Sequence, residues 1–406
     1  MKKYLTIWLV FIIVALSCDN EKTIYPFYKD YFIKYYGESG NQWGVDMKQL
    51  PDGFILLGAS EKEGEKKKIY LVKVDELGNE VWSATFGNEF GNEAASIKIT
   101  PEGNFIIAAT VGSASGQTDV MLLRVDQNGN KLDSAVYGSP LFSETASEVI
   151  NAASGEYVLI GTSEEVQLKE LNGIWVLRTQ PGTLDTLSQQ LWRRYHANGD
   201  LNYGVGVVQA GNYFYCLATS DGEDVNQGSS RSGTNYYLIP LEGSGEQLTY
   251  KAYGTPGEEI AAQLLKTDGG FVLLGTTVSG SQSEIYVTKI SEGLAEQGQF
   301  NVFGQGNIKA SAIADYDLGY LILGEEWIGD DGNIFLANVD KFGNPIWKRS
   351  YGSTFYGEAF GSDYGGKNVV KLKDGSIVFI ATVAMEFQMK MALFKVNQEG
   401  DLKPEG

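Results

Sequence analysis

The sequence is poor in the side chains that most often bind metals or form disulfides. Its 406 residues include one histidine and two cysteines, Cys18 and Cys216. A single histidine excludes zinc sites built from several histidines. Cys18 ends an apolar N-terminal leader, so we expect no disulfide within the chain. Cys216 lies in a run of residues typical of a buried strand, where cysteine behaves as a small apolar side chain.

Proline and positive charge are also scarce. Nine prolines, 50 glycines and 43% hydrophobic residues are not the composition of a linker or a disordered chain, and they fit a globular β protein rich in turns. The formal net charge is −19. Such a surface repels nucleic acid and anionic lipid headgroups, so we expect no nucleic-acid partner.

Sequence signatures of familiar enzyme chemistry are missing as well. The chain has no nucleophile elbow, no Walker loop, no dinucleotide fingerprint and no cluster of Cys and His residues. Residues 329–333 resemble part of an acidic calcium loop, but the spacing and the distal glutamate of a full loop are lacking. We therefore predict a protein that is not an enzyme and that uses no cofactor and no metal.

What the sequence does contain is a repeat. An aromatic residue followed by glycine returns at intervals of 48 to 59 residues, and the degenerate copy His196-Ala197 fills the one gap. The only histidine is therefore expected to be structural. Seven copies predict seven structural units. The six clear copies are Tyr36-Gly37, Phe86-Gly87, Tyr137-Gly138, Tyr253-Gly254, Phe303-Gly304 and Tyr351-Gly352.

Residues 87–138 show the pattern inside one unit. Four short runs of strand-forming residues are separated by turn sequences, one of them an Asn-Gly of the hairpin type. Four strands per unit are typical of a propeller blade. The four expected strands are 93–100, 105–110, 119–126 and 131–137.

These units resemble a repeat family of secreted and lipidated Bacteroidota proteins, in which a unit reads approximately W-x-x-x-Y-G-G, then D-G-G-Y, then K-x-D-x-x-G-N-x-x-W. The matching segments include Pro51-Asp-Gly-Phe54 and Val74-Asp-Glu-Leu-Gly-Asn79. The resemblance covers about residues 31–403 and implies the propeller fold, with little about chemistry. The tryptophans at the matching offset are expected to pack between blades; they are Trp82, Trp192 and Trp347.

The two ends of the chain predict how the ring closes. Residues 31–37 have the pattern of a fourth strand, whereas the last unit stops after its third strand at 391–396. We therefore expect the N-terminal strand to complete the last blade, which removes an unpaired sheet edge. The predicted fold class is all-β: a seven-bladed β-propeller with four-stranded blades over residues 31–406.

The N-terminus has the pattern of an export signal. Two lysines precede an apolar run that ends in Ala15-Leu-Ser-Cys18. This resembles a bacterial lipoprotein box, in which the cysteine is acylated and becomes the new N-terminus, although Ala15 stands where Leu is commoner. The resemblance implies a signal peptide over 1–17 and a lipidated tether over 18–30 that begins at Cys18. The acidic residue Asp19 resembles the surface-export signal of Bacteroidota lipoproteins. An ordinary cleaved signal is the alternative.

Six aromatic residues fall in the long connections that a propeller would place on one face of blades 6, 7 and 1. Aromatic anchors beside acidic residues suit contact with a protein or a glycan. The alternative is that some of these rings plug the central channel. The candidate partner-binding residues are Trp43, Trp327, Phe355, Tyr356, Phe360 and Tyr364.

Together these features predict a non-enzymatic lipoprotein of the outer membrane, exposed at the cell surface. A tether of residues 19–30 spans roughly 40 Å at most, so the folded body stays near the membrane. We expect a recognition or scaffold module that docks onto an outer-membrane protein complex, with an integral barrel protein as partner. The alternative is a surface glycan-binding or glycan-degrading lipoprotein. Five glutamates that precede first strands could ring one mouth of the channel and hold a cation or serve hydrolysis, although such carboxylates more often only solvate the mouth: Glu93, Glu144, Glu258, Glu259 and Glu358.

Overall fold

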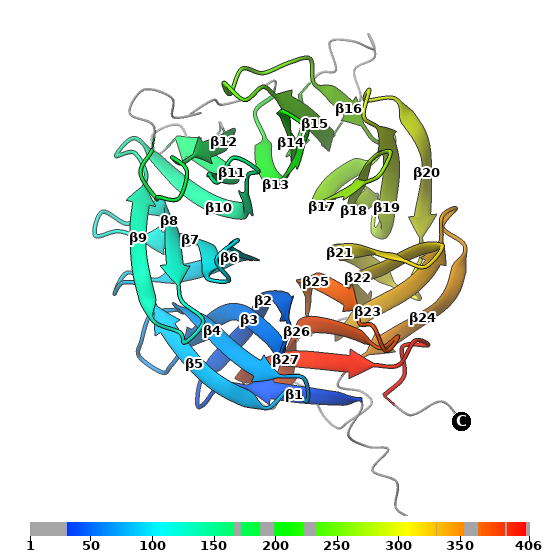
Figure 1. Ribbon diagram of the computed structural model, residues 1–406. Coiled ribbons are helices and arrows are strands. Elements are labelled where there is room, and N and C mark those ends of the chain that lie inside the picture. Colours follow the sequence, from blue (N-terminus) through cyan, green and yellow to red (C-terminus); the bar gives the residue numbers. More distant parts are fainter. Residues whose placement is uncertain are drawn as a thin grey trace, which may run out of the picture.

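The protein is a seven-bladed β-propeller, as the repeat predicts. The computed structural model describes residues 31–165, 172–186, 199–222, 233–329, 331–352, 364–385 and 388–402. Seven small antiparallel sheets stand around one axis (Figure 1). No helix long and apolar enough to span a membrane occurs within these ranges.

Each blade runs outward from the axis in chain order. The innermost strands are β2 (Asn41–Leu50), β6 (Asn92–Ile99), β10 (Phe142–Asn151), β13 (Asn202–Ala210), β17 (Glu258–Thr267), β21 (Asn307–Tyr316) and β25 (Tyr364–Lys371). The second strands are β3 (Gly53–Glu61), β7 (Phe105–Gly112), β11 (Tyr157–Glu165), β14 (Tyr213–Ser220), β18 (Gly270–Ser279), β22 (Gly319–Ile328) and β26 (Ile377–Met385).

The third and outermost strands complete the blades. The third strands are β4 (Lys68–Asp75), β8 (Thr118–Val125), β12 (Asn172–Arg178), β15 (Asn235–Leu241), β19 (Gln282–Ser291), β23 (Asp331–Asp340) and β27 (Gln388–Val396). The outermost are β5 (Glu80–Phe86), β9 (Lys131–Tyr137), β16 (Lys251–Tyr253), β20 (Glu296–Val302), β24 (Pro345–Tyr351) and β1 (Phe32–Tyr36). The third blade shows three strands in the described part of the chain, and Trp192 and His196 lie outside it.

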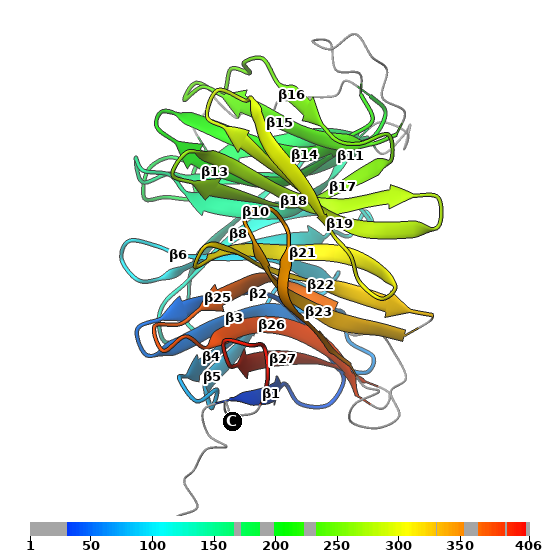
Figure 2. The same cartoon turned by 90° about the vertical axis from the view of Figure 1, so that its right-hand side faces the viewer.

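The ring closes through the N-terminal strand. β1 pairs antiparallel with β27, with Phe32 opposite Lys395 and Tyr36 opposite Met391. The last blade therefore has the order β1-β27-β26-β25, and both views show β1 beside β27 (Figure 2). The expected closure is confirmed.

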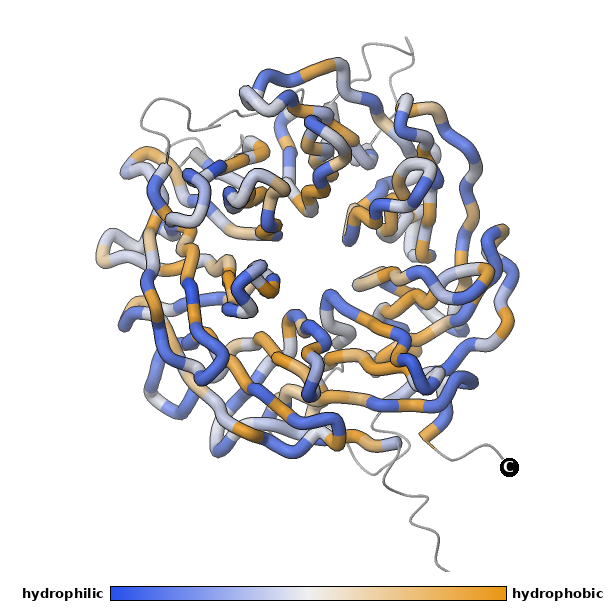
Figure 3. Tube along the Cα trace, in the orientation of Figure 1, coloured by the Kyte–Doolittle hydropathy of each residue, from blue (hydrophilic) through white to orange (hydrophobic). Residues whose placement is uncertain are grey.

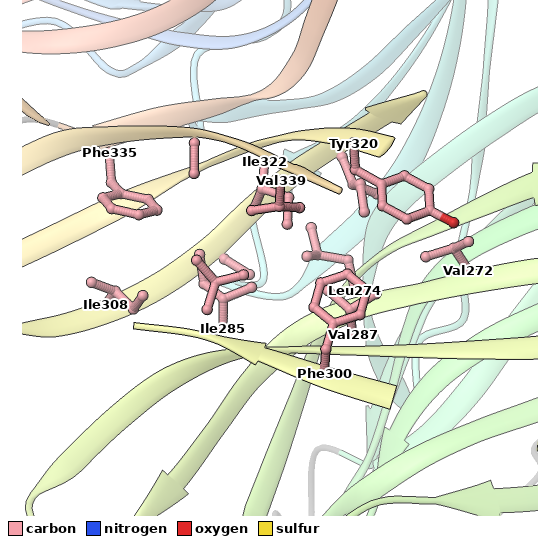
Figure 4. Close-up of a cluster of buried hydrophobic side chains, with 14 residues drawn as sticks. Val272, Leu274, Ile285, Val287, Phe300, Ile308, Tyr320, Ile322, Phe335 and Val339 are labelled. Atoms are coloured by element: carbon pink, nitrogen blue, oxygen red, sulfur yellow. The ribbon is translucent and has the colours of Figure 1, made fainter. Parts of the chain in front are cut away.

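Buried apolar side chains form the core between adjacent blades. Hydrophobic segments concentrate in the strands (Figure 3). Between blades 5 and 6, Leu274 and Val287 face Ile308 and Ile322, and all four are fully buried (Figure 4). A fully buried side chain of this size contributes about 1.5 to 3 kcal/mol. Each blade thus needs both neighbours to cover its two faces.

Where the recurrent aromatic residue is a tyrosine, its hydroxyl donates a hydrogen bond to the next blade, whereas Phe86 and Phe303 hold the same position without a hydroxyl. The hydroxyl of Tyr36 donates to the Gly78 carbonyl at 2.8 Å, and Tyr253 and Tyr351 make the equivalent bonds to Leu294 and Gly400. In each case the acceptor lies in the turn that follows the third strand of the next blade.

The tryptophan of the repeat contacts the same turn. The Trp82 indole donates to the Gln127 carbonyl at 3.0 Å, and Trp347 bonds Gln398 in the same way. A Cβ on Gly129, which has a φ of +85°, would lie 3.0 Å from the Trp82 ring. Glycine therefore satisfies both the left-handed turn and the close approach. Trp82 and Trp347 pack between blades, as predicted.

We predict that Tyr36→Phe destabilises the ring by about 1 kcal/mol, because it removes one hydrogen bond and keeps the buried ring. Urea unfolding of the folded chain would measure this. Tyr213→Phe is the control, since the Tyr213 ring is exposed on β14. Equal stability of the two variants would contradict the proposed role of the Tyr36 hydroxyl.

Candidate functional site

The structure places three of the six candidate aromatic residues. Trp43 lies on β2 and Trp327 near the end of β22, both half-buried, and Tyr364 is the first residue of β25. β25 packs against both β2 and β22, so these three positions share one sector of the ring. Phe355, Tyr356, Phe360 and the lipidation candidate Cys18 lie outside the described residues.

A bulge in every innermost strand reveals a set of equivalent positions. In blades 1 to 6 the register shifts after a Gly or Ala, as between Gly44 and Asp46 or between Ala261 and Gln263, and in blade 7 it shifts after Gly365. The residue before that Gly or Ala occupies the same place in each blade. We call these seven the mouth positions: Trp43, Glu93, Thr145, Tyr203, Ile260, Lys309 and Tyr364.

The mouth positions lie toward the face from which the blade-to-blade connections emerge. Tyr203 and Ile260, on neighbouring blades, are 42% and 46% exposed. Across blades 1 and 2, Lys67 forms an ion pair with Glu93 at 3.0 Å, and its ammonium lies 4.5 Å from the centre of the Trp43 ring. Sequence reasoning found Trp43 and Tyr364 but missed Tyr203 and Ile260. Each of them is followed by a small residue, Gly204 or Ala261, and this pattern in the sequence could have identified the position.

Further apolar side chains are exposed on the same face. They lie in the connections between blades and in those between second and third strands: Phe90, Leu141, Leu201, Phe303, Ile328 and Met385. The opposite face is built from tight turns. Asp75, Asp126 and Asp340 each accept backbone hydrogen bonds within their own turn, which rigidifies that face.

A cavity of about 370 Å³ lies within the ring and is lined by all seven innermost strands. Its wall is uneven. Blades 7, 1, 2 and 3 supply charged side chains, among them Lys48, Lys98 and Lys367, whereas blades 4 and 5 supply mainly glycine and alanine.

A belt of hydrogen bonds ties the innermost strands together at this level. In blades 1, 2, 3 and 5 the residue after the bulge accepts a hydrogen bond from a backbone amide of the next blade. Asp46 accepts from Ile97 at 3.0 Å, and Glu148 accepts from Val207 at 3.1 Å. Ser96 and Gln263 bond Val149 and Ile313 in the same way.

The two carboxylates of this belt also pair with lysines. Lys48 lies 2.6 Å from Asp46, and Lys98 lies 2.7 Å from Glu148. Burial alone would raise the pKa of Asp46, but the ammonium groups of Lys48 and Lys98 and the hydrogen bonds hold that pKa below its usual value. Asp46 is therefore a buried carboxylate kept in its charged form.

The glutamates expected at the channel mouth do not form a ring. Glu144 and Glu259 are buried, and Glu259 accepts hydrogen bonds from Thr255 at 2.6 Å and Thr277 at 2.9 Å. Exposed Glu93 pairs with Lys67 instead. Glu358 is outside the described residues, within which no group of three or more His, Cys, Asp and Glu is placed to hold a metal. The buried glutamates brace the loop that enters their blade.

Comparison with known proteins gives structural matches alone. No family model and no curated protein matches the chain. Drosophila plexin A, solved in complex with semaphorin 1b, matches with a TM-score of 0.51 and 9% identity over 91% of this chain and 86% of that chain. The likeness is one of fold. Drosophila semaphorin 1a matches with a TM-score of 0.50 and 9% identity over 90% and 87% of the two chains.

A third match is to an enzyme. The periplasmic gluconolactonase of Pseudomonas aeruginosa has a TM-score of 0.49 and 12% identity, over 76% of this chain and 88% of that chain. At these low identities the matches show a likeness of fold alone, and a fold does not carry a function. The function has to be argued from the residues of this ring.

We predict that Asp46→Ala costs about 3 kcal/mol at neutral pH, because it leaves the buried Lys48 without its partner. A carboxyl whose pKa is lower in the folded than in the unfolded protein stabilises the fold at pH values above its unfolded pKa. This contribution is lost as the pH falls through the folded pKa. The difference between wild type and Asp46→Ala in urea unfolding should therefore shrink in acid.

The control for this measurement is Asp52→Ala. Asp52 pairs with Lys73 at 2.8 Å on the surface, and such exposed pairs contribute at most about 1 kcal/mol. If Asp46→Ala were no more destabilising than Asp52→Ala, the belt would not hold the innermost strands in place.

Proposed function

We propose that this propeller is a non-enzymatic recognition module that binds a protein partner through its mouth face, meaning the face that carries the mouth positions and the blade-to-blade connections. The observation that carries the proposal is the presence of large side chains at three mouth positions of that face: Tyr203 and Ile260 are exposed, and Trp43 is partly exposed. Aromatic and large apolar side chains are the usual energetic anchors of protein interfaces.

The two faces differ in a way that suits this role. The mouth face combines variable connections with exposed apolar side chains such as Phe90, Leu141 and Phe303. Variable loops on a rigid scaffold are the usual carriers of binding. The opposite face consists of short turns whose aspartates are already bonded to their own backbone.

The N-terminal tether complements this arrangement. β1 is antiparallel to β27 and leads into the connection toward β2, so the chain enters the ring on the tight-turn face. A lipid on Cys18, with residues 18–30 as tether, would attach the ring to the outer membrane from that side. The mouth face would then be free to bind the exposed part of a membrane complex, with an integral barrel protein as the proposed partner.

We predict that Tyr203→Ala combined with Ile260→Ala lowers copurification of the partner from gentle detergent extracts by about tenfold or more, as expected for anchor residues. Thermal unfolding should change little, because both side chains are half-exposed. Quantitative mass spectrometry of the captured proteins measures the effect.

The matched control is Leu318→Ala with Phe342→Ala. These side chains are 82% and 78% exposed on the tight-turn face, and their removal should leave capture unchanged. Equal capture by all variants would contradict a docking role for the mouth face. Retention of the ring on a polysaccharide, with no protein partner, would favour the glycan-binding alternative instead.

We predict that Cys18→Ser releases the protein from the membrane fraction, because the thiol that carries the acyl chains is lost. Fractionation and labelling with a radioactive fatty acid report the change. Cys216→Ala is the control, since Cys216 is buried in β14. A Cys18→Ser variant that keeps its label would exclude this anchor.

A further inference from the structure

The cavity on the ring axis has an excess of lysine, although the chain as a whole is strongly acidic. Four lysines line it, against three carboxylates, in a protein of net charge −19. The lysines are Lys48, Lys98, Lys309 and Lys367, and the carboxylates are Asp46, Glu148 and Glu325. Surface charge alone does not account for this concentration of ammonium groups.

Two of the carboxylates are already engaged by the protein. Asp46 and Glu148 each bind a backbone amide of the next blade and one lysine. These bonds fix Lys48 and Lys98 in place. An ammonium group has three N–H donors, so each lysine keeps donors that its single carboxylate partner does not use.

The third carboxylate replaces a threonine of the repeat. In five blades a threonine at the equivalent place of the second strand accepts a bond from the next innermost strand, as Thr276 does from the Ala310 amide at 2.9 Å. Glu325 holds that place in blade 6. It is 6% exposed, and burial raises its pKa despite the nearby Lys309.

Lys367 differs from Lys48 and Lys98 in its electrostatic partners. It extends from β25 and donates to the carbonyls of Ala95 and Ser147, both at 3.3 Å, on the strands β6 and β10. Among the described residues no carboxylate lies within ion-pair distance of its ammonium group. Burial lowers the pKa of Lys367; the charges of Asp46 and Glu148 oppose this shift, and the charge of Lys98 adds to it. An incoming anion would relieve both the burial cost and this repulsion.

The opposite wall leaves room for the rest of a ligand. Gly204, Gly206, Ala261 and Ala262 line it, from blades 4 and 5. A Cβ added at Gly206 would lie 3.0 Å from a carboxylate oxygen of Glu148, so glycine at this position lets Glu148 reach the Val207 amide. The volume of about 370 Å³ is at the small end of the range for ligand sites.

We propose that the axial cavity binds a small polar molecule that carries an oxyanion, either a carboxylate or a phosphate group. The oxyanion lies between Lys98 and Lys367, with Lys48 nearby, and the uncharged body of the molecule rests against the Gly and Ala wall. Charge-assisted hydrogen bonds of this kind are roughly twice as strong as neutral ones. The site is inside the ring and does not depend on a protein partner.

The test is isothermal titration calorimetry of the whole mature chain with three probes: glucuronate, inorganic phosphate and glucose. We expect binding of glucuronate or phosphate that weakens with added salt, and glucose binding at least about tenfold weaker. A preference for glucuronate would assign a carboxylated sugar, and a preference for phosphate would assign a phosphate compound. Lys367→Met should lower the affinity for the preferred anion by about tenfold or more.

The matched control is Lys289→Met. Lys289 also donates to a backbone carbonyl, that of Lys341 at 2.7 Å, but it does not line the cavity, so its loss should leave binding unchanged. Lys98→Gln provides a second variant if Lys367→Met does not fold. The proposal is overturned if neither anion binds wild type at millimolar concentration, if glucose binds equally well, or if both cavity variants bind like wild type.

Discussion

The pairing of β1 with β27 is the constraint on which the rest of the structure depends. A blade on its own exposes two apolar faces, and a row of blades would leave one such face at each end. Pairing Phe32–Tyr36 with the last third strand removes both ends at once. It also brings β25 against β2, so that the innermost strands surround one axis. Without this closure there would be no mouth and no cavity.

Closure is reinforced by polar contacts that pass from each blade to the next. Tyr36 bonds the turn at Gly78, and the amide of Gly44 bonds Thr382 across the same junction. Asn368 reaches the Met47 carbonyl at 3.0 Å. The junction between the last and first blades therefore uses the same kinds of bond as the others. This explains why the aromatic residue, the threonine and the turn glycine recur together in the sequence.

The sequence was sufficient to predict the fold because its signals are local. An aromatic residue before glycine, a turn with Asp and Gly, and short apolar runs all report on neighbouring residues, and the four strands of residues 87–138 were placed to within two residues. The frame shift between the two ends predicted the closure. The missing fourth strand after residue 396 could be supplied only by residues 31–37.

The site was less predictable because its residues meet across the ring. Lys367 contacts Ala95 and Ser147, which lie more than two hundred residues away in the chain, and no local pattern reports such a contact. Tyr203 and Ile260 looked like ordinary strand residues until the bulge register aligned them with Trp43. The glutamates near the first strands do not act as one set. Glu259 bonds Thr255 in its own blade, whereas Glu93 pairs with Lys67 of the preceding blade.

The charges inside the ring are related to the hydrogen bonds between the innermost strands. Four blades place a hydrogen-bond acceptor after the bulge, and in blades 2 and 5 a neutral Ser96 or Gln263 is enough. Blades 1 and 3 use Asp46 and Glu148 instead, which cost more to bury and therefore require Lys48 and Lys98 beside them. If the belt had only a structural role, neutral acceptors throughout would cost less free energy to bury. The proposed oxyanion site would use these charged pairs together with Lys367, which donates to backbone carbonyls between them.

Residues at the mouth positions and residues of the cavity wall are also neighbours in the chain. Tyr203 precedes Gly204, Ile260 precedes Ala261, and Lys309 belongs to both sets. A protein bound over the mouth would rest on residues whose immediate neighbours form the cavity wall. Thermodynamic linkage then requires reciprocity: if an anion in the cavity changes the affinity for a partner, the partner changes the affinity for the anion by the same factor.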